Sequence, residues 1–234
     1  RWDRSNPAPI SAARTPKWVQ GYSDPTSLLY ALTTTRDIAT VYSFNAGGFD
    51  VEALSPAMNY SLALLQGQVT PQRSFERYAR WGEEEDRPVF WETPHGPVTV
   101  RGRLIGGCMD CLVDLLGTPF DGTLDFIERY KGDGILWYFD VFALKAEQVY
   151  NALWHMRTCG WFRHAAGVVF GRVCFPGSEL GLTYREMITA ALPDLPLVLE
   201  ADVGHVSPRM TLINGAVATL TAEGGKGTLA MELV

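Results

Sequence analysis

The sequence predicts an α/β protein, built as a partial N-terminal α/β domain followed by a C-terminal α/β domain that ends in β-hairpins. Three observations lead to this prediction. Apolar segments typical of buried strands alternate with segments whose apolar residues recur at helical spacing. The composition changes between residues 66 and 97. The end of the chain alternates as strands do, around a glycine-rich turn at residues 224–227.

The N-terminal part, residues 1–65, is expected to hold two strands and two helices. Residues 17–20 are typical of a short strand, which a sharp turn joins to a helix beginning near Pro25. Proline suits the first turn of a helix, where its missing N–H costs nothing. A second strand at 38–44 and a helix at 55–65 follow.

Residues 66–97 are predicted to form a solvated linker or insertion. The stretch carries an acidic run at 83–86 and prolines at positions 71, 88, 94 and 97. Such punctuation and charge are typical of exposed segments that lie outside a packed core.

The C-terminal domain, residues 98–234, is predicted to alternate strands and helices. The strand at 134–144 is nearly continuous in apolar residues, as in a parallel sheet covered on both faces, and its one charge before Lys145 is Asp140. The other expected elements, in order, are a strand at 98–104, a helix at 111–116, a helix at 147–159, a strand at 166–172, a helix at 180–192, a strand at 195–199 and the hairpin strands from 210 onward.

Composition excludes several classes of protein. The 234 residues are 47% hydrophobic and carry a net charge of −6, with no block of Lys or Arg. We therefore expect no nucleic-acid partner and no binding to an anionic membrane. No run of about 20 apolar residues is present, so no membrane span is expected. We see no secretion signal and expect a cytoplasmic protein, although the sequence begins at Arg1, so an upstream piece is expected to be missing.

Cysteine usage favours free thiols in a reducing compartment. Cys108 and Cys111 form a C-x-x-C pair, but no second pair and no nearby histidine completes a zinc site. Cys159 and Cys174 stand alone in apolar surroundings. We therefore expect no metal and no cofactor.

Three residues are candidates for nucleophilic chemistry. Ser23 lies on the predicted strand-to-helix turn, where a serine projects outward and backbone N–H groups point at a developing oxyanion, although a serine there also serves as a simple helix cap. His205 follows a predicted strand, and its alternative interpretation is a surface-loop histidine. Asp140 must end its strand, be protonated or have a partner, because an unpaired buried carboxylate is costly. Together they would supply a nucleophile, a base and an orienting acid.

Several segments in collinear order resemble the LD-carboxypeptidases, a family of serine peptidases that includes the microcin C immunity peptidase. Residues 16–29 resemble the family's PKxxxGYSDxTxLL segment, and 104–119 resemble its GGNLxxLxxLxGTP segment. Residues 134–140 resemble its GKILFLE strand, 166–171 its AGxxxG strand, and 202–215 its GHxxPxxxxPxG ending. The resemblance extends from about residue 16 to the C-terminus.

The resemblance implies a metal-free serine carboxypeptidase that releases the terminal D-alanine of murein tetrapeptide during peptidoglycan recycling. Ser23 falls on the family's nucleophile, His205 on its base and Asp140 on its acid, while the N–H of Asp24 would stabilise the oxyanion. The resemblance also implies a homodimer, with the three residues assembled between the two domains.

Three departures from the family pattern stand out. Asp140 replaces a glutamate, Cys108 an asparagine and Asn214 a proline. The family also carries an α/β half before the nucleophile, whose glycine-rich loop donates a second oxyanion N–H. Without that half, from a missing segment or a second chain, we expect little activity.

Two alternatives to the murein peptidase remain. One is a microcin C-type immunity hydrolase acting on a peptide–nucleotide or acyl–sulfamoyl adenylate. It would need an aromatic platform, for which Trp81, Trp91 and Trp161 are candidates. The other is a catalytically impaired relative that binds a ligand, favoured by the aspartate at position 140. A basic clamp for a free carboxylate would instead favour a peptidase.

Overall fold

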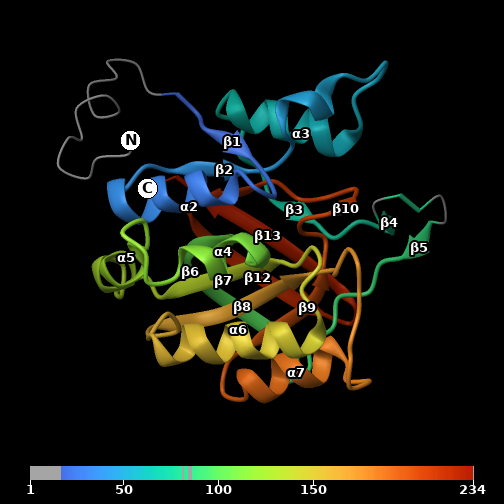
Figure 1. Cartoon of the computed structure of the whole chain (residues 1–234). Helices are drawn as coiled ribbons and strands as arrows, with labels where there is room; N and C mark the ends of the chain where they lie inside the picture. The colour runs from blue at the N-terminus through green and yellow to red at the C-terminus, as the bar shows by residue number, and fades with distance from the viewer. Residues whose placement is uncertain (1–16, 81, 84–85, 234) are drawn as a thin grey trace.

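The computed structural model describes residues 17–80, 82–83 and 86–233. Its centre is a mixed sheet of seven strands in the order β3-β13-β12-β6-β7-β8-β9 (Figure 1). Strands β6 to β9 run parallel, and β12, β13 and β3 add antiparallel pairs at one edge. The strands span Gln72–Arg73 (β3), Val98–Cys108 (β6), Ile135–Asp140 (β7), Ala165–Gly171 (β8), Leu197–Ala201 (β9), Val217–Glu223 (β12) and Lys226–Glu232 (β13).

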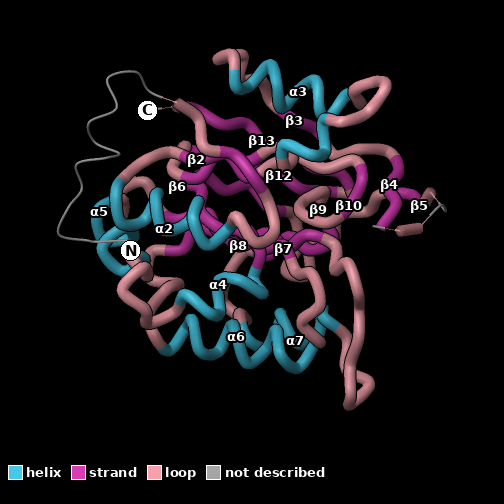
Figure 2. The backbone as a smooth tube through the Cα atoms, turned by 45° about the horizontal axis from the view of Figure 1, so that its top comes forward, coloured by secondary structure: helices cyan, strands magenta, loops and turns pink. Residues whose placement is uncertain are grey.

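Strand β7 lies in the core, with both faces of the sheet covered around it. Its apolar sequence predicts this position. Trp137 and Phe139 point into a hydrophobic cluster shared with the helices on one face, whereas Leu136 and Tyr138 join a second cluster on the other. The helices of the first face are α4 (Met109–Leu115), α5 (Thr123–Arg129), α6 (Ala146–Thr158) and α7 (Tyr184–Ala191). Figure 2 shows α4, α6 and α7 together on that side.

The N-terminal part forms a small sheet beside the second cluster. Strands β1 (Gln20–Gly21) and β2 (Thr40–Tyr42) are parallel, with α2 (Thr26–Arg36) between them in sequence. A strand from the other end of the chain, β11 (Leu212–Asn214), pairs antiparallel with β2. A short 3-10 helix (Ala46–Phe49) and α3 (Pro56–Leu65) follow, and Ser55 caps α3.

The segment 66–97, expected to be a linker, contains three short strands among its described residues. Strand β3 pairs with β13 in the main sheet, and β4 (Arg77–Arg80) pairs with β10 (Val206–Ser207) and with β5 (Arg87–Pro88). These strands have almost no signal in the sequence, because strands this short carry no alternating pattern.

Other differences from the prediction are local. The strand expected at 134–144 ends at Asp140, and the helix expected at 180–192 begins at Tyr184, after a capping box of Thr183 and Glu186. Helix α5 was not predicted. Among the described residues, no helix combines the length and the apolar composition needed to span a bilayer.

Candidate active site

Ser23 lies in the tight turn between β1 and α2, as the sequence predicts. Its φ of 66° places it in the left-handed region, which non-glycine residues rarely adopt and which is often found at functional turns. The preceding Gly21 leaves room for the turn, since a Cβ there would lie 2.7 Å from Cβ of Pro25. The serine is therefore presented, partly exposed, on a strained strand-to-helix turn.

Asp24 is exposed and stands at the N-terminal end of α2. Within the described chain, its backbone N–H donates no hydrogen bond, whereas the next turn closes through Thr26 N to the Ser23 carbonyl at 2.8 Å. A free N–H at a helix N-terminus is suited to an anionic oxygen. This is the place where the sequence puts an oxyanion donor.

Asp140 is the last residue of β7 and is fully buried. Its Oδ2 accepts hydrogen bonds from the Tyr42 hydroxyl and from the ring of His205, each at 2.7 Å, and the His205 backbone N–H lies 3.3 Å from Oδ1. A buried carboxylate is tolerated when donors satisfy it in this way. Two of the options left open by the sequence, a strand end and an imidazole partner, therefore hold together.

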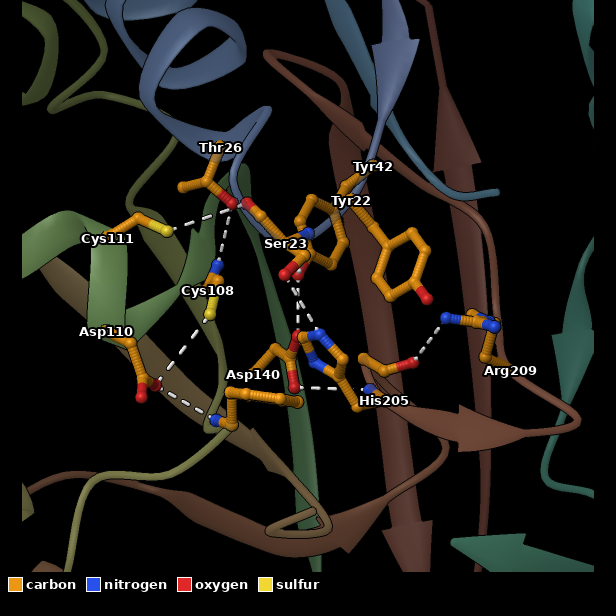
Figure 3. A network of polar contacts seen from close by, with 12 residues as sticks. Tyr22, Ser23, Thr26, Tyr42, Cys108, Asp110, Cys111, Asp140, His205 and Arg209 are labelled. Carbon is orange, nitrogen blue, oxygen red and sulfur yellow. Dashed lines mark hydrogen bonds and ion pairs between the residues drawn. The ribbon is translucent and has the colours of Figure 1, made fainter. Parts of the chain in front are cut away.

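His205 lies in the loop between β9 and β10 and connects the other two candidates. Its Nδ1 contacts Asp140, and its Nε2 lies 3.0 Å from Oγ of Ser23 (Figure 3). Because a carboxylate can only accept, Nδ1 carries the proton and Nε2 is left to accept the serine O–H. The structure thus brings Ser23, His205 and Asp140 into one hydrogen-bonded line. The shorter side chain at position 140 still reaches the imidazole.

Gly204 makes this close approach possible. It has a φ of 87°, and a Cβ built on it would lie 1.9 Å from Oδ1 of Asp140. Any larger residue would push the carboxylate away from the histidine.

Tyr42 is a site residue that the sequence reasoning missed. Its hydroxyl donates to Asp140 and accepts from the backbone N–H of Ser23 at 3.3 Å. Burial, reinforced by the charge of Asp140, raises the pKa of Tyr42 well above its usual value, so the phenol keeps its proton. The sequence placed this residue in a strand, but nothing in an apolar strand indicates which carboxylate its hydroxyl meets.

Two aromatic rings flank His205. The Tyr22 ring centroid lies 5.0 Å from that of the imidazole, and the Phe142 centroid 4.5 Å. The loop carrying Phe142 is held by Asp110, whose carboxylate accepts from the backbone N–H groups of residues 142, 143 and 144 at 2.9, 2.9 and 3.1 Å. The imidazole is therefore positioned by packing as well as by hydrogen bonds.

The tryptophans considered as a ligand platform lie elsewhere. Trp91 is buried and its indole N–H donates to Asp202 at 3.1 Å, and Trp161 is buried in a stack with Tyr30 and Trp137. Trp81 lies outside the described residues. Trp91 and Trp161 are therefore core residues.

The C-x-x-C pair lies next to the serine turn. All four cysteines are free, and Sγ of Cys111 lies 3.7 Å from the carbonyl oxygen of Ser23. The contact between the two thiols lowers the pKa of Cys111 and, together with burial and the charge of Asp140, raises the pKa of Cys108. Among the described residues, no group of three or more His, Cys, Asp or Glu side chains is placed to hold a metal ion.

Taken together, the fold and the site define an α/β protein with a Ser–His–Asp arrangement of the serine-hydrolase type, at the carboxyl end of a parallel strand. The sequence profile of the LD-carboxypeptidase C-terminal domain matches residues 101–220. The chain belongs to the LD-carboxypeptidase family.

Several known proteins are similar to this chain in sequence or in structure. A Vibrio cholerae protein that bears the name Putative carboxypeptidase is 25% identical, over 88% of this chain and 64% of its own length. The chain thus spans less than two thirds of that relative. The crystal structure of an MccF-like protein from Bacillus anthracis has a TM-score of 0.72 at 20% identity, covering 93% of this chain and 68% of its own. That of a muramoyltetrapeptide carboxypeptidase from Oxalobacter formigenes has a TM-score of 0.70 at 19% identity, covering 92% and 67%. These two likenesses support the fold.

Proposed function

We propose that the protein is a serine carboxypeptidase that hydrolyses the L,D peptide bond before the terminal D-alanine of murein tetrapeptide, in cytoplasmic peptidoglycan recycling. The observation that carries the proposal is the hydrogen-bonded line from Ser23 through His205 to Asp140. Family membership and the muramoyltetrapeptide carboxypeptidase among the structural neighbours support the substrate class.

In this mechanism His205 moves the proton. Its Nε2 takes the hydroxyl proton of Ser23 as the serine oxygen attacks the carbonyl carbon, and Asp140 stabilises the imidazolium that forms. The N–H of Asp24 stabilises the oxyanion, together with a second donor expected from the family's glycine-rich loop. The intermediate then expels the amine of D-alanine, which receives the proton from His205. Water hydrolyses the acyl-enzyme through the same base and restores Ser23.

The test is the release of D-alanine from murein tetrapeptide by the protein expressed from its complete gene. We expect Ser23→Ala to reduce turnover to less than about 10⁻³ of the wild-type rate. The same peptide ending in L-alanine is the substrate control. Equal turnover of Ser23→Ala and wild type would contradict the assignment of the nucleophile.

A fluorophosphonate, which reacts with activated serines, separates an enzyme from a relative that only binds a ligand. In the protein expressed from its complete gene, we expect it to label Ser23, and we expect His205→Ala to stop the labelling because the base is lost. A protein that does not label while folded would instead be a binding relative.

A microcin immunity hydrolase is the second candidate, favoured by the MccF-like neighbour and by the aromatic rings of Tyr22 and Phe142 beside His205. Those rings offer faces on which a nucleobase could stack. Turnover of an aminoacyl sulfamoyl adenylate with higher kcat/KM than the tetrapeptide would establish this function in place of the first.

A further inference from the structure

Arg209 is a cation held rigidly beside the proposed catalytic residues. Its guanidinium carbon lies 4.2 Å from the ring centroid of Tyr22 and 4.8 Å from that of Phe44. Its Nη1 donates to the carbonyl oxygen of Gly204 at 3.0 Å, so the side chain is tied to the residue before His205. Contacts with two aromatic rings and a carbonyl fix the position of the charged group before any ligand arrives.

This cation has no counter-ion within the described part of the chain. None of the ion pairs there includes Arg209, and its Nε is buried with no hydrogen-bond partner. Arg172 shows the contrast: it is fully buried and one of its N–H groups also lacks a partner, but its guanidinium pairs with the buried Asp202 at 2.5 Å. A partly buried guanidinium without a counter-ion is unfavourable unless a ligand supplies the opposite charge. In a chain with a net charge of −6, a cation left unpaired at this place indicates an anionic ligand.

The position of Arg209 suits a group next to the bond under attack. Tyr22 lies between the guanidinium and the imidazole of His205, in contact with both, and immediately precedes Ser23. Figure 3 shows Arg209 on the far side of Tyr22 and His205 from Cys111, with its head directed toward them. One amino acid residue spans about 3.5 Å. A peptide whose last bond reaches Ser23 would therefore bring its terminal carboxylate toward Arg209.

We propose that Arg209 binds the free terminal carboxylate of the amino acid that the reaction releases. The inference rests on the proposed carboxypeptidase function. A guanidinium matches a carboxylate with two parallel hydrogen bonds, which gives recognition by geometry as well as by charge. Arg209 thereby makes the enzyme select a C-terminal residue, and it supplies the basic clamp that distinguishes a peptidase acting on chain ends from a nucleotide-directed hydrolase.

The test compares two substrates that differ in one group. Murein tetrapeptide with a free terminal carboxylate and the same peptide ending in a carboxamide are given to the protein expressed from its complete gene. We expect the wild type to prefer the free acid by about 10- to 100-fold in kcat/KM, since hydrogen bonds to a charged group are strong. In Arg209→Met the ratio should fall toward one, mainly through a higher KM for the acid. Arg209→Lys should keep part of the preference because it keeps the charge.

The matched control is Arg101→Met. Arg101 is an exposed arginine in the first half of β6, where it pairs with Glu232. This variant should keep the wild-type ratio. If Arg209 serves only to hold Gly204 and hence His205, Arg209→Met will lose activity on both peptides equally and the ratio will stay, which overturns the proposal. A wild type that cleaves neither peptide would show instead that the proposed function itself is wrong.

Discussion

The hydroxyl of Tyr42 donates a hydrogen bond to the Asp140 carboxylate at 2.7 Å, across 98 positions of sequence. The same oxygen accepts the backbone N–H of Ser23. One phenol on β2 therefore contacts both ends of the Ser–His–Asp line and ties the N-terminal sheet to the end of β7. We infer that Tyr42 is a positioning residue that keeps the nucleophile turn and the acid in register.

Tyr42→Phe should lower kcat/KM by about 10- to 100-fold, by the loss of one hydrogen bond to a charged group and of the one that holds the turn. The fall should come mainly in kcat, because Tyr42 is buried and its hydroxyl bonds to the groups that it aligns for the reaction. Steady-state kinetics and the rate of fluorophosphonate labelling would measure it.

Tyr138→Phe is the matched control for this prediction. Tyr138 is also buried, and its ring lies 5.5 Å from that of Tyr42, but its hydroxyl donates to Asn214 at 2.9 Å and not to the acid. Both variants should lose a similar, small amount of stability. Equal kinetics in the two variants would show that Tyr42 has no particular role in positioning.

The candidate site illustrates how far the sequence can lead. The sequence indicates Ser23, Asp140 and His205 as candidates because each has a local signal: a turn before a helix, a lone charge in an apolar strand, and a loop after a strand. Tyr42 and Arg209 have no such signal, because their roles depend on contacts with residues distant in sequence. Asp110 was missed for the same reason, although it holds the loop at 142–144.

The fold shows the same division. The long strands and helices have periodic apolar patterns, which predict that these elements exist. Only their first and last residues differ by a few positions from the prediction. Strands β3 to β5 are two to four residues long. Strands β3 and β4 pair with β13 and β10, from the far end of the chain, so their pairing is a tertiary property, and β5 pairs with β4. Helix α5 was missed because only one turn of apolar residues marks it.

Gly204→Ala should disrupt the site more than it strains the backbone. The new Cβ would overlap the Asp140 carboxylate, so we expect labelling by fluorophosphonate to fall at least about 100-fold and the free energy of unfolding to fall by about 2–4 kcal/mol. Urea unfolding and labelling rates would measure the two effects.

Gly67→Ala separates strain from overlap. Gly67 has nearly the same φ, 89°, but a Cβ there meets nothing within 4 Å. It should therefore cost only about 1 kcal/mol, the usual penalty of the left-handed conformation, with normal labelling. A similar loss of labelling in both variants would contradict the role assigned to Gly204.

Stability should decline in alkali because the side chains of Tyr30, Tyr42 and Tyr138 are deeply buried. Burial raises the pKa of Tyr30, Tyr42 and Tyr138 well above 10.0. The unfolded chain releases these protons near pH 10, whereas the folded chain retains them. The stabilisation that these three groups contribute to the folded protein is therefore fully present below about pH 10 and is lost as the pH rises above it. Each of these tyrosines should lower the free energy of unfolding by about 1.4 kcal/mol per pH unit in that range.

Urea unfolding between pH 8 and pH 11 would check this, with tyrosinate absorbance followed in parallel. Tyr138→Phe should make the decline shallower by about 1.4 kcal/mol per pH unit, since one of the three groups is gone. The prediction is wrong if the free energy of unfolding is flat above pH 10, or if the buried tyrosines ionise before the protein unfolds.

Alkylation should distinguish the two thiols of the C-x-x-C pair. Cys111 is half-buried and its pKa is lowered by the contact with Cys108, whereas Cys108 is buried and its pKa is raised. Because the thiolate is the reactive form, iodoacetamide at pH 7.5 should modify Cys111 at least about tenfold faster than Cys108, as peptide mass spectrometry would show. In Cys108→Ser, Cys111 loses the thiol that lowers its pKa and should react more slowly. If Cys111 reacts equally fast in that variant, exposure alone governs its reactivity.

Alkylation of Cys111 should also slow the reaction of Ser23 with fluorophosphonate, because Sγ of Cys111 contacts the carbonyl oxygen of Ser23. The Cys111→Ser variant should be protected from this inhibition.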